Sequence, residues 1–377
     1  MSDHTHRWSE TRPESTARPS TDFTRKDKMT PPERMGRIMA GKSVDRVPFN
    51  PFALGFCAKV AGVDRGVYYR NPEGAFEIGL NFAKRYPWMN ARPVYGWADR
   101  GAWEFGGQII WPNNNASAAP RSFGPVISDP SEVDGLPDPD PKTAGAMPLI
   151  DRFNTVSREY GMPASLPGGT PTTYSASIVG DETFMRWTIL HPDAVHALQR
   201  KVTDFLLRTT ELTIARFGGE NCSLNCSLPV DSNLLMSPKT FAEFSKPYVK
   251  EILGFCLERG VRSVMVHLCG DHTGNLIHWR DMPLAPRTIF FIGHEMDIEA
   301  TGRFIGKEHI VAGNIRTPLL QSGLPEEVYA DTVRCLRAGM GHPGGFILMP
   351  ACELPPDTPY ENLDAVAQAL YDHGYYE

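Results

Sequence analysis

The sequence predicts an α/β fold, namely a single (β/α)8 barrel of the TIM type that follows an N-terminal extension. A chain of 377 residues is long enough for one such barrel. From about residue 165 onwards, strand-like runs alternate with helical patterns long enough to connect parallel strands. In addition, side chains that bind metals follow two of the expected strands, and barrel enzymes place their chemistry at the carboxyl ends of strands.

The composition indicates a globular protein and gives no sign of a nucleic-acid-binding or membrane protein. Hydrophobic residues make up 41% of the chain and charged residues 22%, which is typical of a globular protein. The net charge of -6 gives no electrostatic reason to expect nucleic acid as a partner. The sequence has no run of about 18 apolar residues that would indicate a membrane span, and its N-terminus lacks the apolar stretch of a secretion signal. We therefore expect a cytoplasmic protein.

The first elements are expected after a polar tail. Residues 1–29 contain too few apolar side chains to offset the entropy of ordering, so we expect a disordered tail and a barrel domain over 30–377. Thr30-Pro31-Pro32-Glu33 predicts the start of the first helix. Residues 47–51 predict a strand. Residues 85–150, rich in Trp, Pro, Gly and Asn, predict long loops and short strands that cover a pocket.

The second half of the chain carries the clearest periodicity. Apolar residues at helical spacing predict a long helix over 192–217, and Ser237-Pro238 predicts the start of the next one. Residues 358–361 predict a capping box before a C-terminal helix. Short apolar runs predict six strands, at residues 175–179, 221–228, 263–268, 288–292, 310–313 and 345–350.

Seven cysteines are present, and their odd number and scattered spacing argue against a disulfide framework. Cys222 and Cys226 lie four residues apart in a predicted strand and are interpreted as core or pocket thiols. Cys57, Cys256 and Cys335 fall on helical or loop stretches and are expected to be packing residues.

The remaining two cysteines and one histidine form a candidate metal site. Because side chains alternate across a strand, His267 and Cys269 point to the same side at the carboxyl end of the strand over 263–268. Cys352 follows the last predicted strand at the equivalent place. Three such ligands would leave one position of a zinc ion open for substrate. Spacing alone leaves a hydrogen-bonded core histidine and inert buried thiols as the alternative.

Longer motifs around these residues resemble a known superfamily. They are residues 267–270 (His-Leu-Cys-Gly), 313–314 (Gly-Asn), 352–363 (Cys-Glu-Leu-Pro-Pro-Asp-Thr-Pro-Tyr-Glu-Asn-Leu) and 45–48 (Asp-Arg-Val-Pro). Together they resemble the uroporphyrinogen decarboxylase superfamily, and more narrowly its zinc methyltransferase branch, which includes the methylcobamide:coenzyme M methyltransferases. The resemblance covers roughly residues 30–377. It implies a (β/α)8 barrel and a zinc ion held by the positions of His267, Cys269 and Cys352.

Further site residues are proposed from their places at predicted strand ends. Glu295 is the best-placed carboxylate for a fourth zinc ligand, with Asp297 and Glu353 as the next candidates and a solvated loop carboxylate as the alternative. Asp231 and Asn314 could bind substrate, whereas a turn or capping role is the alternative for each.

The resemblance implies a zinc-dependent methyltransferase that moves a methyl group between a corrinoid (cobalamin) and a small-molecule thiol or a methoxy or methylthio substrate. The sequence does not fix the direction of transfer, the substrate or the oligomeric state, a homodimer being one option. It contains no Asp-x-His-x-x-Gly segment of the kind that ligates cobalamin. We therefore expect a separate corrinoid-binding protein as partner.

Two other hypotheses stay open at this point. A metal-free decarboxylase of uroporphyrinogen would have the same fold, but the chain lacks the Arg-Gln-Ala-Gly-Arg-like run near its N-terminus that such enzymes use to bind propionates. A non-enzymatic barrel would hold its zinc as a structural ion or serve as a corrinoid-binding partner. Neither explains why three ligands meet at the catalytic end of a barrel.

Overall fold

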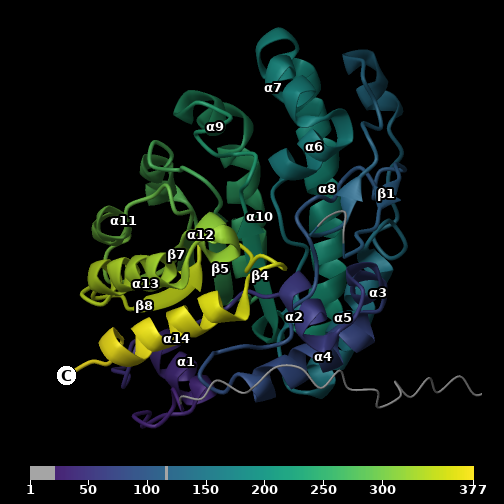
Figure 1. The fold of residues 1–377 in the computed structure, drawn as a ribbon. Helices are drawn as coiled ribbons and strands as arrows, with labels where there is room; N and C mark the ends of the chain where they lie inside the picture. The colour runs from purple at the N-terminus through teal and green to yellow at the C-terminus, as the bar shows by residue number, and fades with distance from the viewer. Residues whose placement is uncertain (1–21, 115–117) are drawn as a thin grey trace, which may run out of the picture.

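We describe a computed structural model of the chain that covers residues 22–114 and 118–377. A parallel sheet of six strands lies at its centre, and its strands are neighbours in the order in which they occur in the sequence (Figure 1). The strands are β3 (Ala164–Ser165), β4 (Cys222–Ser227), β5 (Ser263–Leu268), β6 (Ile289–Ile292), β7 (Ile310–Ile315) and β8 (Phe346–Pro350). A separate antiparallel pair is formed by β1 (Ile109–Ile110) and β2 (Arg121–Ser122).

Two extended segments from the first hundred residues continue the sheet beyond β8. Phe49 forms a parallel bridge with Leu348, and the Asn50 amide donates to the Leu348 carbonyl at 3.0 Å. The amide of Asn90 donates in turn to the carbonyl of Phe49 at 2.7 Å. The six strands and these two segments make up the number of positions in a TIM-type barrel.

Helices surround the sheet on its outer side, as Figure 1 shows for α8, α10, α13 and α14. Each buries an apolar face; Val195, Leu198 and Val202 of α8, for example, are fully buried. The α-helices are α1 (Pro31–Met39), α2 (Gly55–Ala61), α3 (Arg65–Arg70), α4 (Pro72–Arg85), α5 (Met147–Glu159), α6 (Pro171–Val179), α7 (Asp181–Leu190), α8 (Pro192–Phe217), α9 (Pro238–Phe244), α10 (Lys246–Glu258), α11 (Ile298–Ile305), α12 (Thr317–Ser322), α13 (Pro325–Gly339) and α14 (Tyr360–His373). Short 3-10 helices are η1 (Pro130–Gly135), η2 (Gly219–Asn221) and η3 (Leu276–Asp281). None of the helices in the described part of the chain is both long and apolar enough to cross a membrane.

The hydrophobic core has two parts. The larger lies between the sheet and the helices. The smaller, which we call the inner core, lies on the inner face of the sheet and consists of Ile38, Phe291, Ile310, Ala312, Ile347 and Met349. Strand register puts His267 level with Phe291 and on this inner face. Because α1 contributes Ile38 to the same cluster, the inner core is packed with apolar side chains beneath His267.

Most elements of the second half match the prediction. The helix over 192–217 is confirmed by α8, and five of the six predicted strands are confirmed by β4 to β8. Ser237 caps α9 by accepting a hydrogen bond from the Thr240 amide at 3.1 Å, as its place before Pro238 predicts. Thr30 and Glu33 form a reciprocal capping box at the start of α1.

The predicted strand over 175–179 is wrong, because these residues belong to α6. Thr170 caps this helix, and its hydroxyl accepts from the Thr173 amide at 3.2 Å. Nearly every residue of α6 is buried, so the helix has no polar face to give a helical period in the sequence. Its small and β-branched residues then resemble a strand.

Two smaller predictions are also corrected. Residues 47–51 are extended but form only the single bridge of Phe49, so they are a sheet-edge segment rather than a full strand. The capping box over 358–361 is absent: Pro359 is the residue before α14, no side chain caps the helix, and the Thr358 hydroxyl is buried without a partner. Burial of Thr358 takes its hydroxyl away from the helix end.

The predicted tail needs a shorter boundary. Residues 1–21 lie outside the described residues, but 22–29 pack against the barrel. Phe23 is only 7% exposed. Asp27 forms ion pairs with two buried arginines, at 2.7 Å to Arg46 and 3.1 Å to Arg34. This carboxylate anchors a stretch whose composition alone indicates disorder, because it is the counterion of the buried Arg46 and shares the buried Arg34 with Asp45.

Candidate metal centre

The carboxyl ends of β5 and β8 deliver the three predicted ligands. His267 lies within β5, and Cys269 follows its last residue before the chain turns at Gly270, where φ is +86°. This positive φ favours glycine at the turn. Cys352 follows β8, whose end is held to β7 by a hydrogen bond of 2.8 Å from the Ala351 amide to the Ile315 carbonyl.

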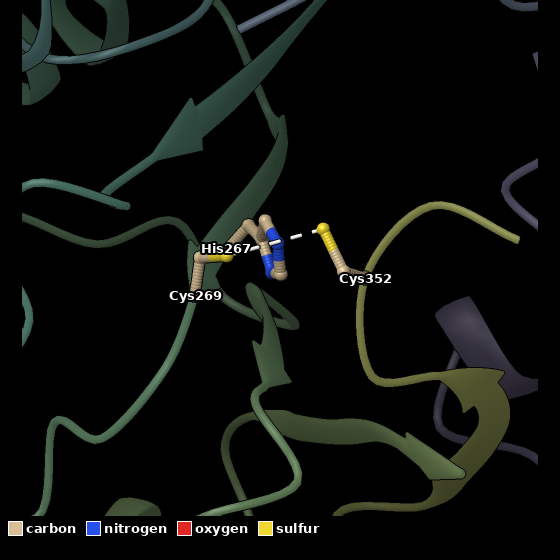
Figure 2. Close-up of side chains that lie close together, drawn as sticks. All are labelled: His267, Cys269 and Cys352. Atoms are coloured by element: carbon tan, nitrogen blue, oxygen red, sulfur yellow. Dashed lines mark hydrogen bonds between the residues drawn. The ribbon is translucent and has the colours of Figure 1, made fainter. Parts of the chain in front are cut away.

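The three side chains converge, as the sequence predicts. The ligand atoms of His267, Cys269 and Cys352 all lie within 4.8 Å of one another. The two sulfur atoms are 3.9 Å apart and point toward each other across the barrel end (Figure 2). Two sulfurs that each lie about 2.3 Å from a tetrahedral zinc ion would be roughly 3.8 Å apart. The spacing therefore fits zinc without rearrangement of the backbone.

His267 is oriented by Phe291 of the neighbouring strand. The two rings stack at 4.0 Å between centroids, and the Phe291 carbonyl lies 3.2 Å from Nδ1 of His267. Because a carbonyl can only accept, Nδ1 carries a proton and Nε2 keeps its lone pair. Nε2 is buried and has no hydrogen-bond partner among the residues that the structure describes. A buried nitrogen with a free lone pair beside two sulfurs is well suited to bind a metal ion.

The two thiols shift each other's pKa in opposite directions. A hydrogen bond from Cys269, with the His267 ring acting in the same direction, holds the pKa of Cys352 well below its ordinary value. The same hydrogen bond raises the pKa of Cys269. A divalent cation at this place would bind both sulfurs as thiolates and displace their protons.

The three carboxylates considered as a fourth ligand lie outside this group. Among the described residues, the cluster of potential ligand atoms contains His267, Cys269 and Cys352 alone. Glu295 follows β6, and its carboxylate lies 3.6 Å from Nδ1 of His294. Its Oε2 and the amide nitrogen of Gly270 both lie 2.7 Å from where a Cβ on Gly293 would be, so Glu295 is next to the turn that follows Cys269. A role for Glu295 as a ligand stays a prediction.

The other two candidates already have protein partners. Asp297 caps α11, where its carboxylate accepts from the Ala300 amide at 2.6 Å. Glu353 accepts from the Gly55 amide at 3.0 Å, and burial raises its pKa to about 8. Both carboxylates are therefore committed to positioning backbone.

Asp231 and Asn314 make contacts within the protein. Asp231 is fully buried and accepts hydrogen bonds from the hydroxyls of Thr170, at 2.9 Å, and Ser245. Burial raises its pKa although these hydroxyls act in the opposite direction. Asn314 donates to the carbonyls of Gly293 and Met296 at 2.9 and 2.8 Å, which shapes the turn that bears Glu295. These bonds correspond to the turn and capping alternative, and substrate contact by either residue stays a prediction.

The contacts that hold the Cys352 loop in place are not apparent from the sequence. Residues 52–55 clamp this loop: the Leu354 amide donates to the Phe52 carbonyl at 3.1 Å, in addition to the bond between Gly55 and Glu353. A Cβ atom on Gly55 would lie 2.6 Å from Cγ of Pro356. Only a residue without a side chain allows this approach. Contacts between segments some 300 residues apart leave no local pattern in a sequence.

The comparisons with known proteins decide the family. Residues 30–373 match the uroporphyrinogen decarboxylase (URO-D) family. The chain belongs to this family. A solved methyltransferase structure from Methanosarcina mazei has a TM-score of 0.71 at 20% identity, covering 92% of this chain and 99% of that one. The predicted α/β fold of the TIM-barrel type is thereby confirmed.

Two curated relatives are methyltransferases. A methylated-thiol–coenzyme M methyltransferase of Methanosarcina mazei is 28% identical over 257 residues, which are 66% of this chain and 64% of the relative. A methylcobamide:CoM methyltransferase of Methanosarcina barkeri is 25% identical over 234 residues, or 59% of this chain and 62% of the relative. The match thus spans less than two thirds of the length of either relative.

Proposed function

We propose that this protein is a zinc-dependent methyltransferase, which moves a methyl group between a corrinoid on a separate protein and a small-molecule thiol or methylated substrate. The observation that carries the proposal is the convergence of His267, Cys269 and Cys352 at the carboxyl end of the parallel sheet. The names of the two curated relatives point to the same reaction class.

The proposed ligands leave room for a substrate. Both sulfurs belong to half-buried cysteines, so the centre can be approached from the barrel end, while the His267 ring behind them is only 3% exposed. Zinc at this position would act as a Lewis acid and would lower the pKa of a bound thiol so that it reacts as the thiolate. The Phe291 carbonyl holds the imidazole in the orientation this requires.

The surface around the centre supports a protein partner. Leu234 and Leu235, after β4, are 66% and 51% exposed, and Ile277, after β5, is 50% exposed. Leu234 borders the turn of the metal centre, because its Cδ1 lies 3.5 Å from where a Cβ on Gly270 would be. Exposed apolar side chains at the entrance to a site are typical of a protein–protein interface. We propose that the corrinoid protein docks on this rim, formed by Leu234, Leu235 and Ile277.

A metal-free decarboxylase would share the family and the fold. It would give no reason for a buried His267 Nε2 without a partner beside two sulfurs. A purely structural zinc would be expected to have four protein ligands and no accessible surface. The half-buried state of Cys269 and Cys352 favours the catalytic alternative.

Zinc content and methyl transfer test the proposal together. We expect about one zinc ion per chain in the purified protein and its loss from the Cys352→Ser variant. Cys256→Ala, which removes a fully buried thiol of α10, is the matched control and should retain zinc. The wild type should transfer methyl groups between free methylcobalamin and added thiols, and the Cys352→Ser variant should not. Metal-free wild-type protein, or full zinc retention by Cys352→Ser, would contradict the proposal.

A further inference from the structure

Arg92 lies on the inner side of the barrel, at a position that the metal centre does not use. The hydrogen bond from the Asn90 amide to Phe49 places this segment next to the sheet edge. Met89 and Ala91 pack into the larger core between sheet and helices. Pro93 packs against α4, since its Cα lies 2.8 Å from where a Cβ on Gly79 would be. Because side chains alternate along an extended segment, Arg92 faces the interior of the barrel.

The Arg92 side chain is accessible to solvent and at the same time close to surrounding protein. Its side chain is exposed. Desolvation by the surrounding protein nevertheless lowers its pKa, and no charged group contributes to this shift. The two observations agree if the guanidinium projects into a solvent-filled space between the barrel walls. Within residues 22–114 and 118–377, Arg92 makes no hydrogen bond or ion pair.

Two other enclosed arginines of the barrel are paired with carboxylates of the protein. Arg34 and Arg46 pair with Asp45 and Asp27, each at 2.7 Å. Arg100 lacks a carboxylate partner in the described part of the chain, and its Nε and Nη1 have no hydrogen-bond partner there. However, Arg100 is only 5% exposed, and its remaining nitrogen donates to the Gly168 carbonyl at 2.9 Å. Arg92 alone among these four combines an exposed surface with no internal partner. A partly desolvated cation without a counterion favours the binding of an anion.

The position of Arg92 relative to the strands brings it to the rim of the metal centre. Phe49 pairs with Leu348 of β8, and Asn90 hydrogen-bonds to Phe49. In the parallel arrangement of a barrel, a residue two positions beyond Asn90 is level with the residues just past β8. Cys352 is one of these residues. A small molecule in the barrel mouth can therefore face Arg92 with one end and the metal centre with the other.

We propose that Arg92 binds an oxyanion group, a carboxylate or a sulfonate, of the small-molecule methyl donor or acceptor, and so directs its reacting sulfur or oxygen atom toward His267, Cys269 and Cys352. The planar guanidinium offers two parallel donors to either group, which selects for charge and for orientation. That the bound molecule gives or accepts a methyl group rests on the proposed function. That the bound molecule is an anion does not rest on it.

Calorimetric binding of three thiols tests the inference: mercaptoethanesulfonate, mercaptopropionate and uncharged mercaptoethanol. We expect wild-type protein to bind the better of the two anionic thiols about tenfold or more tightly than the uncharged one, as a charge-assisted bidentate pair allows. The Arg92→Met variant should lose this preference, and Arg92→Lys should retain part of it. Arg337→Gln, a change on the outer face of α13, should leave it intact. Thermal unfolding of all three variants shows whether each remains folded.

The outcomes separate this inference from the proposed function. No preference for anionic thiols in the wild type, or an unchanged preference in folded Arg92→Met, overturns the role of Arg92 even if the protein holds zinc and transfers methyl groups. An Arg92-dependent preference in a protein without methyl transfer would support the anion site and contradict the proposed function instead. The sulfonate and carboxylate probes show which oxyanion the site prefers.

Discussion

Phe291 contacts the His267 ring in two ways that help to orient it. Phe291 supplies both a stacked ring, at 4.0 Å, and the carbonyl that fixes which nitrogen of His267 carries the proton. The carbonyl belongs to the backbone and remains when the Phe291 side chain is replaced. Substitution of Phe291 therefore tests the contribution of the stacked ring alone. Groups that orient a metal ligand commonly affect metal affinity although they never touch the metal.

We predict that Phe291→Leu weakens zinc binding by about tenfold, at the lower end of the effect expected for an orienting group. Phe290→Leu is the matched control, because Phe290 is equally buried on the same strand but packs against Trp279 in the larger core. Both variants should lose roughly 1–2 kcal/mol of stability from a smaller core side chain. Competition with a chelator measures the zinc affinity, and equal affinities in the two variants would contradict a role for the stacked ring.

At the scale of elements, the metal centre joins segments from both ends of the chain. Residues 52–55, before and at the start of α2, hold the loop after β8 through the contacts of Phe52 and Gly55 with residues 353–356. The position of Cys352 is thus determined in part by residues from the beginning of the fold.

The Gly55→Ala variant should displace the Cys352 loop. Its new methyl group would lie 2.6 Å from Pro356 and 3.2 Å from the Ala118 carbonyl, so one of these neighbours must move. We expect weaker zinc binding and lower stability. Gly36→Ala on α1, where a Cβ meets nothing within 4 Å, is the control and should stabilise the protein by roughly 0.5–1 kcal/mol. A normal zinc affinity in Gly55→Ala would show that the clamp does not position Cys352.

The first helix is joined to the barrel by Asp45. Burial alone would raise its pKa, but hydrogen bonds from Arg34 and the Lys28 amide outweigh burial and lower the pKa to about 2. Because the folded-state pKa lies below the unfolded value, this carboxylate stabilises the fold above about pH 4, and the contribution disappears as the pH falls toward 2.

The Asp45→Asn variant should therefore be destabilised by on the order of 2 kcal/mol at pH 7. The difference from wild type should shrink progressively between about pH 4 and pH 2. Urea unfolding at pH 7 and at pH 3 measures it. A difference that stays constant over this range would mean that packing, rather than the charge of Asp45, stabilises the start of the fold.

Over the whole molecule, the sequence predicts helices and strands with a local hydrophobic period better than it predicts contacts between distant segments. The strand that bears His267 and Cys269, and the helix over 192–217, follow from periods that a few residues reveal. The buried helix α6 has no such period, and its sequence therefore predicts a strand where the structure has a helix. Likewise, the packing of Asp27 against Arg34 and Arg46 and of Gly55 against Pro356 depends on tertiary contacts, which single-sequence patterns do not contain.

The exposed rim formed by Leu234, Leu235 and Ile277 allows a test of the proposed docking of the corrinoid protein. The loops after β4 and β5 are joined by a hydrogen bond of 2.7 Å from the Asn233 amide to the Asp271 carbonyl. Leu234 and Ile277 are therefore presented by loops held to one another, and within residues 22–114 and 118–377 at least half of each side chain stays exposed. Transfer from a corrinoid on its carrier should require this surface, whereas transfer from free methylcobalamin should not, because the free cofactor reaches the centre without docking of a protein.

We predict that Leu234→Asp lowers kcat/KM with the corrinoid protein by about tenfold or more, as loss of a central apolar contact in an interface does. Activity with free methylcobalamin and zinc content should both be unchanged. Leu212→Asp, on the outer side of α8 and 37% exposed, introduces the same charge away from the rim and should behave like wild type. If Leu234→Asp reduced both activities equally, the residue would act on the metal centre through Gly270, and the partner would have to dock elsewhere on the molecule.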